Sequence, residues 1–224
     1  MKSRKLLVPA LAALVLLGAC SDDTAPTHND DAIRGQVIDG LGQPVSGASI
    51  MLEYVGESLP DKPQTGIRFT LPDAGAATIW IASYCDGDTV RMLVDEVLPA
   101  GEYTIIWDLR DDLGRIVPDG VYRVHAVTPA GHAQYPWVLF RPGYADLPPD
   151  APVAAQATTD SLGRFRLAQD CLPFGHGYGS VFGMETITRR VRVWALHPDF
   201  VAASSEWAIV DAEDGADLTV TLVR

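Results

Sequence analysis

The stretch GQVIDGLGQPVSGASIMLEY, residues 35–54, decides the fold class of this chain. Residues 35–38 have the composition of a β-strand, and the glycine- and proline-rich residues 39–44 are typical of a turn. Residues 48–54 then predict a returning strand in which Ala48, Ile50 and Leu52 share one face. We therefore expect a β-hairpin with one buried face.

The same pattern continues towards the C-terminus. Short runs rich in Val, Ile, Thr, Tyr and Trp are separated by Gly, Pro and Asp, which is typical of a sandwich or a barrel. The expected strands are 67–71, 77–84, 89–94, 101–107, 120–127, 133–140, 163–167, 188–196, 206–210 and 217–223. No segment has a sustained helical period, so the sequence predicts an all-β protein.

Two groups of motifs resemble the same family. GQVID at 35–39 and GQPVSGASI at 42–50 resemble the opening hairpin of carboxypeptidase regulatory-like domains, which are small transthyretin-like β-sandwiches. TDSLGRF at 159–165 and LPFG at 172–175 are similar to later hallmarks of that family, and LTVTL at 218–222 is similar to its closing strand. The long separation between the two groups departs from the family pattern.

The intervening segment resembles a second family. IRFTLP at 67–72, VRMLV at 90–94, PAGEY at 99–103, DLGR at 112–115 and GVY at 120–122 occur in the same order in the immunoglobulin-like domain of flagellar hook-capping proteins. Within this segment, Trp107 and Tyr122 lie on consecutive expected strands. We expect them to form a cross-strand aromatic pair in the core.

Together the resemblances imply two nested β-sandwich modules. The regulatory-like sandwich would be split between residues 33–60 and 153–224, and the immunoglobulin-like sandwich would occupy residues 66–140. Residues 141–152, with four prolines, would form an extended linker. Loop tips of sandwiches tolerate such insertions. A single large sandwich is the alternative.

The N-terminus resembles a bacterial lipoprotein signal. Basic residues precede an apolar run that ends at Leu17, and Gly18 and Ala19 precede Cys20. This order predicts a signal peptide over residues 1–19, a lipidated Cys20 and a flexible, polar tether over residues 20–32. Ser21 at the second mature position suggests sorting to the outer membrane. An ordinary secretory signal and an uncleaved anchor are the alternatives.

The charge of the chain limits its partners. Loss of Lys2, Arg4 and Lys5 with the signal peptide takes the formal net charge from −12 to −15. Nucleic acid and anionic lipid head groups both require clustered cations, so neither is an expected partner. The expected link to the membrane is therefore the lipid on Cys20.

The sequence has no pattern typical of a catalytic site or a cofactor site. Ser180 lies among glycines that lack the spacing of a nucleophile elbow, and residues 177–183 are expected to be a flexible loop. His125, His132, His176 and His197 show no spacing typical of zinc ligands. No cofactor is expected, and we expect the protein not to be an enzyme.

Three further features allow alternative interpretations. Cys85 and Cys171 remain after lipidation, and they could form a disulfide or lie buried as separate thiols. Asp108, Asp111 and Asp112 could bind calcium, although acidic residues are also common in solvated hairpin turns. Trp194 alternates with Val193 and Ala195, so it could face outward and stack against a sugar ring.

The leading hypothesis for function is a non-catalytic lipoprotein of the cell envelope. It would present its sandwich modules to a protein partner or act as a structural spacer. The second hypothesis is a carbohydrate-binding accessory protein, and the third is a hydrolase whose site is not recognisable from the sequence.

Overall fold

The computed structural model describes residues 31–54, 66–139, 143–180 and 183–224, and it confirms the all-β prediction. In these ranges the only helix is a 3-10 turn at Gln169–Cys171, and none could cross a membrane. The predicted signal peptide, Cys20 and tether residues 20–30 lie outside the described residues. The strands are β1 (Asp31–Asp39), β2 (Ser49–Tyr54), β3 (Gly66–Leu71), β4 (Gly75–Ser83), β5 (Thr89–Leu98), β6 (Gly101–Ile106), β7 (Gly120–Thr128), β8 (Gly131–Leu139), β9 (Ala157–Thr158), β10 (Arg164–Ala168), β11 (Gly177–Ser180), β12 (Gly183–Thr186), β13 (Arg190–Leu196), β14 (Ala203–Ser204), β15 (Ala208–Ile209) and β16 (Ala216–Leu222).

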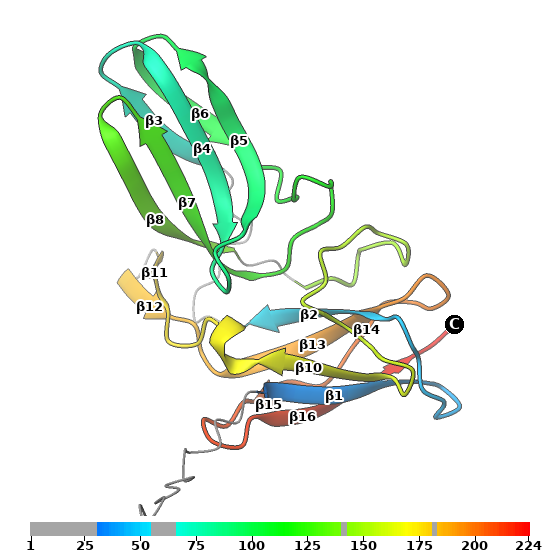
Figure 1. The fold of residues 1–224 in the computed structure, drawn as a ribbon. Coiled ribbons are helices and arrows are strands. Elements are labelled where there is room, and N and C mark those ends of the chain that lie inside the picture. The colour runs from blue at the N-terminus through cyan, green and yellow to red at the C-terminus, as the bar shows by residue number, and fades with distance from the viewer. Residues whose placement is uncertain (1–30, 55–65, 140–142, 181–182) are drawn as a thin grey trace, which may run out of the picture.

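The first two strands and the strands after β8 form one unit, which we call the outer unit. One sheet has the order β10-β1-β16, and the other has the order β14-β13-β2-β9 with β15 also paired to β13. The two sheets form facing layers (Figure 1). Alternate side chains of these strands fill the space between them, because Ile33, Val37, Leu52, Val193 and Val220 are all completely buried.

Strands β3 to β8 form a second unit, the inner unit, which projects from the outer one (Figure 1). Its sheets have the orders β3-β6 and β5-β4-β7-β8. Trp107 and Tyr122 lie in its core with ring centroids 5.3 Å apart and planes at 76°. Trp107 follows β6 and Tyr122 lies on β7, so the pair joins the two layers. The expected aromatic pair in the core is confirmed, although its two residues lie in facing layers and are not opposite each other on paired strands.

The expected hairpin between β1 and β2 is wrong, because the two strands lie in different sheets. β1 pairs antiparallel with β10 and parallel with β16, whereas β2 pairs with β13 and β9. The connection crosses between the layers, and the Gly47 N–H donates to the Thr159 carbonyl on the way. The Thr159 hydroxyl also accepts from the Ala48 N–H and donates to the Val45 carbonyl, both at 2.8 Å.

The two motif groups that are distant in sequence meet in the pairing of β1 with β10. Gly35 lies opposite Phe165, and the Phe165 ring occupies the space above the glycine. A side chain at position 35 would collide with this ring and with the Leu218 carbonyl oxygen. The glycine of the first motif therefore makes room for the phenylalanine of the second.

One turn occurs three times, as DGLGQ at 39–43, DDLGR at 111–115 and DSLGR at 160–164. In each turn the aspartate Oδ1 accepts two backbone N–H groups, from the third and the fifth residue. The fourth residue is a glycine with φ between 71° and 77°, a conformation that favours glycine. The sequence repeat thus encodes one local geometry in both units.

Two expected irregular segments are ordered differently in the structure. The predicted loop at 177–183 includes β11 and the first residue of β12, and these two strands pair with each other. The predicted linker is described from residue 143, and it packs against the protein instead of extending from it. The side chain of Tyr144 is buried, and its hydroxyl accepts from the Asp119 N–H at 2.8 Å and donates to the Leu52 carbonyl at 3.3 Å. Leu147 and Val153 pack with it over the outward-facing Met51, Trp194 and Leu196.

A disulfide between Cys85 and Cys171 joins the two units. Cys85 lies in the turn between β4 and β5, and Cys171 ends the 3-10 turn after β10, with 4.5 Å between the Cα atoms. Of the two alternatives for these thiols, the structure shows the bridge. A cleft of about 490 Å³ lies beside it, lined by Tyr54, Arg166 and Leu172 of the outer unit and by Tyr84, Asp119 and Tyr122 of the inner unit.

Candidate functional site

The outward side of the β10-β1-β16 sheet is the strongest candidate for a functional surface. Alternation places Arg34 and Gln36 of β1, Arg164 and Arg166 of β10, and Asp217 and Thr219 of β16 on this side, while Ile33, Val37, Phe165 and Val220 point into the core. We call these six outward residues the arginine face. They make up half of the residues that line a shallow hollow of about 810 Å³.

The pairing of the strands brings two like charges together on this face. Arg34 lies directly opposite Arg166 in the β1–β10 register. Like charges at directly opposed positions disfavour the pairing of two strands. Arg34 forms an ion pair with Asp217 at 3.3 Å, Asp160 also lines the hollow, and Arg164 and Arg166 are exposed. Three guanidinium groups thus gather on one side of a chain whose net charge is −12.

The chemistry of this face favours carboxylate ligands. A guanidinium group offers donors in a planar fork that matches the two oxygens of a carboxylate. Among the described residues that line the hollow, Phe165 is the only aromatic one, and it is 3% exposed. A pyranose ring would therefore find no aromatic surface for stacking among the described lining residues. The face fits an acidic peptide segment better than a neutral sugar.

Sequence reasoning did not identify the arginine face. Its three arginines are separated by up to 132 positions, from Arg34 to Arg166, and only the pairing of β1 with β10 brings them together. The alternation of Arg164 and Arg166 around Phe165 was the available local signal.

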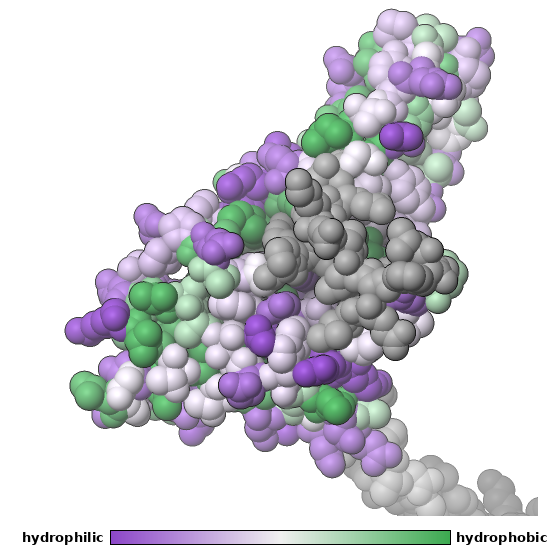
Figure 2. Space-filling view, turned by 180° about the vertical axis from the view of Figure 1, so that it is seen from behind, coloured by the Kyte–Doolittle hydropathy of each residue, from purple (hydrophilic) through white to green (hydrophobic). Residues whose placement is uncertain are grey.

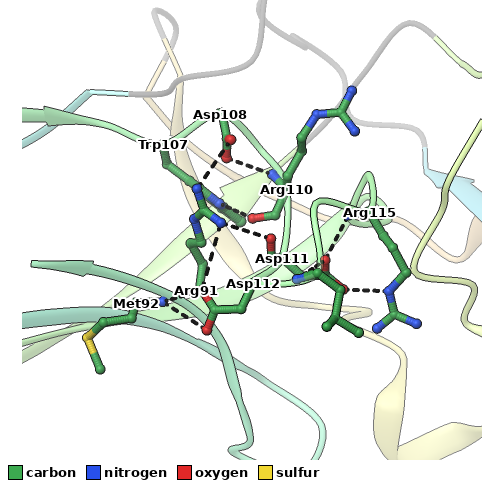
Figure 3. Close-up of polar contacts among 9 residues, drawn as sticks. Arg91, Met92, Trp107, Asp108, Arg110, Asp111, Asp112 and Arg115 are labelled. Carbon is green, nitrogen blue, oxygen red and sulfur yellow. Dashed lines mark hydrogen bonds and ion pairs between the residues drawn. The ribbon is translucent and has the colours of Figure 1, made fainter.

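The three aspartates considered for calcium contact arginines instead (Figure 3). Arg91 on β5 approaches Asp108 at 3.5 Å and Asp112 at 3.8 Å, and it donates to the Asp111 carbonyl at 3.1 Å. Arg115 donates its Nε–H to the Asp111 carboxylate at 2.7 Å. Each of the three carboxylates therefore lies beside a guanidinium group, and the described residues contain no group of three or more side chains that could hold a metal ion.

We expect the free energy of unfolding to depend on pH through the ionisation of Asp111. Burial alone would raise the pKa of Asp111, but the Arg115 N–H and guanidinium and the Leu113 N–H outweigh burial, so the pKa lies below 3.8. A lowered pKa in the folded state stabilises the protein above pH 3.8, and this contribution is lost as the pH falls through the folded-state value. We expect Asp111→Asn to lower the free energy of unfolding by about 1–3 kcal/mol at pH 7, and the difference from wild type to shrink near pH 3.

Urea unfolding at the two pH values measures this effect. The exposed Asp73 on the β3–β4 turn is a suitable control, and Asp73→Asn should leave stability unchanged at both. A constant difference between Asp111→Asn and wild type from pH 7 to pH 3 would contradict the assignment.

The expectation that Trp194 faces a ligand is wrong. Its side chain is 7% exposed, and its indole N–H donates to the Glu53 carboxylate at 2.6 Å. Arg192 lies 3.7 Å from the same carboxylate, and the Tyr144 ring packs edge-on against Trp194. The alternation along β13 was read correctly, but the segment from residue 143 covers the side that would otherwise face solvent.

Comparison of the chain with protein-family models, with curated proteins and with solved structures found no match. We therefore infer the function from the residues of this chain alone.

Proposed function

We propose that the chain is a non-catalytic protein of the cell envelope, anchored through a lipid on Cys20, that binds an acidic segment of a protein partner on the arginine face. The two resemblances support modules of accessory type, a regulatory-like sandwich interrupted by an immunoglobulin-like one. The opposed Arg34 and Arg166 carry the proposal, because they bring two guanidinium groups together on one side of a sheet in an acidic chain.

Two further observations support a polar mode of contact. On the side seen in Figure 2, hydrophobic residues lie in small groups among hydrophilic ones. Three of the large exposed apolar residues, Leu41, Leu113 and Leu162, lie at the third position of the repeated turns, while others, such as Val97 on β5 and Ile106 on β6, lie on strands. Charge complementarity would then determine the choice of partner. The carbohydrate hypothesis relied on an outward-facing Trp194, but Trp194 is buried.

Site-specific photo-crosslinking in the native cell tests the contact surface. A photoreactive residue at the exposed Thr219 should give a discrete crosslinked species, and the same residue at the exposed Thr104 on β6 should not. Charge reversal by Arg34→Glu with Arg166→Glu should reduce the Thr219 product more than about tenfold, because each contact becomes repulsive. The matched control is Arg68→Glu, an exposed position on β3 of the inner unit.

Equal crosslinking from Thr219 and Thr104, or no loss on charge reversal in a protein that remains folded, would contradict the proposal. Thermal unfolding of the double variant distinguishes a lost contact from a lost fold.

The lipid anchor on Cys20 can be tested separately. We expect Cys20→Ser to move the protein from the membrane fraction to the soluble fraction, because a chain this acidic has no electrostatic attraction for anionic lipid. Mass measurement of the membrane-bound wild type should show a chain that begins at Cys20 and carries acyl groups. Retention of the Cys20→Ser variant in membranes would indicate an uncleaved anchor instead.

A further inference from the structure

The hairpin formed by β7 and β8 brings the side chains of two histidines together on one side of the sheet. His125 pairs with Gln134, and Val127 pairs with His132, so the two histidines are diagonal neighbours on one side of the sheet. The His125 Nδ1 atom lies 3.2 Å from the His132 Nε2 atom. His125 is half-buried and His132 is exposed.

Trp80 fixes the orientation of this histidine pair. Trp80 lies on β4 opposite His125, and the two rings stack with centroids 4.7 Å apart and planes within 6°. The His132 ring lies 6.2 Å from Trp80 with planes within 14°. Three nearly parallel rings thus form a platform on the outward side of the β5-β4-β7-β8 sheet, which restricts the rotation of both imidazoles.

The separation of the two nitrogens fits a shared metal ion. Imidazole nitrogens bind Zn²⁺ at about 2.0–2.1 Å, so two nitrogens on one ion with bond angles between square and tetrahedral lie about 2.9–3.4 Å apart. The observed 3.2 Å falls within this range. A direct hydrogen bond between the rings also fits this distance, and it would need one ring to donate and the other to accept.

The charges around the pair allow metal binding. Partial burial, followed by the charges of His132 and Arg123, lowers the pKa of His125, and the neutral imidazole is the form that binds metals. Arg123 lies two residues from His125 on β7, but its guanidinium group lies over the Tyr84 ring, 5.2 Å from the ring centroid. The contact with Tyr84 therefore holds the Arg123 guanidinium group at the junction between the units.

We propose that His125 and His132 form a two-histidine site for a late first-row divalent metal ion, with Cu²⁺ bound most tightly. Imidazole suits copper, nickel and zinc, and Cu²⁺ has the highest affinity in this series. Two protein ligands leave the remaining positions to water or to a group from another molecule. No group of three or more potential ligands occurs in the described part of the chain, so the site would exchange its metal readily. The proposal is independent of the arginine face.

Titration of the full-length protein with Cu²⁺, followed by calorimetry and by tryptophan fluorescence, tests the site. We expect one ion per chain and quenching of Trp80, whose ring lies against His125. His125→Gln and His132→Gln should each weaken binding more than about tenfold. His197→Gln is the matched control, because His197 lies elsewhere, beside Phe200 in the outer unit. It should leave the binding curve unchanged.

Electron paramagnetic resonance of the Cu²⁺ complex should show coupling to imidazole nitrogen that is reduced in either His125→Gln or His132→Gln. Because His132 is exposed, we expect the His132→Gln variant to fold normally, and thermal unfolding checks this. Absence of saturable Cu²⁺ binding would overturn the proposal. So would binding that survives both single substitutions, or binding that His197→Gln weakens equally.

Discussion

Replacing Trp107 with alanine is expected to lower the free energy of unfolding by about 3–5 kcal/mol, the range for a large aromatic residue removed from a core. Trp107 is completely buried, and its ring packs edge-on against Tyr122 across the two layers of the inner unit. Its indole N–H also donates to the Arg110 carbonyl at 2.9 Å. The substitution therefore leaves a cavity and an unpaired carbonyl, and both are costly.

One companion variant separates the packing of the ring from the hydrogen bond, and a second provides a comparison with another tryptophan. Trp107→Phe keeps a ring against Tyr122 but loses the hydrogen bond, so we expect an intermediate loss of stability. Trp207→Ala removes a half-buried tryptophan that lies 4.3 Å from the Arg192 guanidinium group, and we expect a loss of about 1 kcal/mol. Urea unfolding followed by circular dichroism measures all three. Equal losses for Trp107→Ala and Trp207→Ala would contradict the central role given to Trp107.

The strands and turns of this protein could be predicted because their signals are local. The alternation of Val191, Val193 and Ala195 places β13 correctly, and the repeated turns follow from the spacing of aspartate and glycine. The crossing of β1 and β2 into different sheets could not be predicted. It depends on hydrogen bonds from the connection to Thr159, which lies more than a hundred positions away.

The residues of the candidate sites depend on pairing between distant strands. Trp194 was expected to face outward because the alternation is correct for β13 alone, yet a segment some fifty residues earlier covers it. Arg34 and Arg166 meet only through the β1–β10 register. His125 and His132 are close in sequence, but a shift of one position in the hairpin would place them on opposite sides of the sheet. The packing of a distant segment decides the first outcome and strand register decides the other two, and the sequence encodes neither of them locally.

The disulfide between Cys85 and Cys171 links the inner unit to the outer unit. Between β2 and β9 the chain leaves the outer unit, forms the inner unit and returns. Cys85 and Cys171 add a third covalent link between the two units, at the wall of the cleft that contains Tyr54 and Asp119. This link restrains the orientation of the inner unit relative to the arginine face, since Cys171 lies just beyond β10.

Removal of this disulfide by Cys85→Ser with Cys171→Ser is expected to destabilise the protein by about 2–5 kcal/mol. The bridge closes a loop whose ends are 86 positions apart, so its loss frees a long segment in the unfolded state. Calorimetry of the double variant, and of wild type with and without reductant, measures the effect. Reductant should lower the stability of wild type to that of the double variant and should leave the double variant unchanged.

Hydrogen exchange locates the effect of the disulfide within the fold. We expect faster exchange in the double variant at the β4–β5 turn and at residues 168–172, which the bridge holds together, and little change at the Trp107 core. A uniform acceleration throughout both units would mean that the bridge supports the whole fold and not the junction. Equal thermal stability of the oxidised and reduced wild type would show that packing of Tyr144 and the cleft residues holds the units together without it.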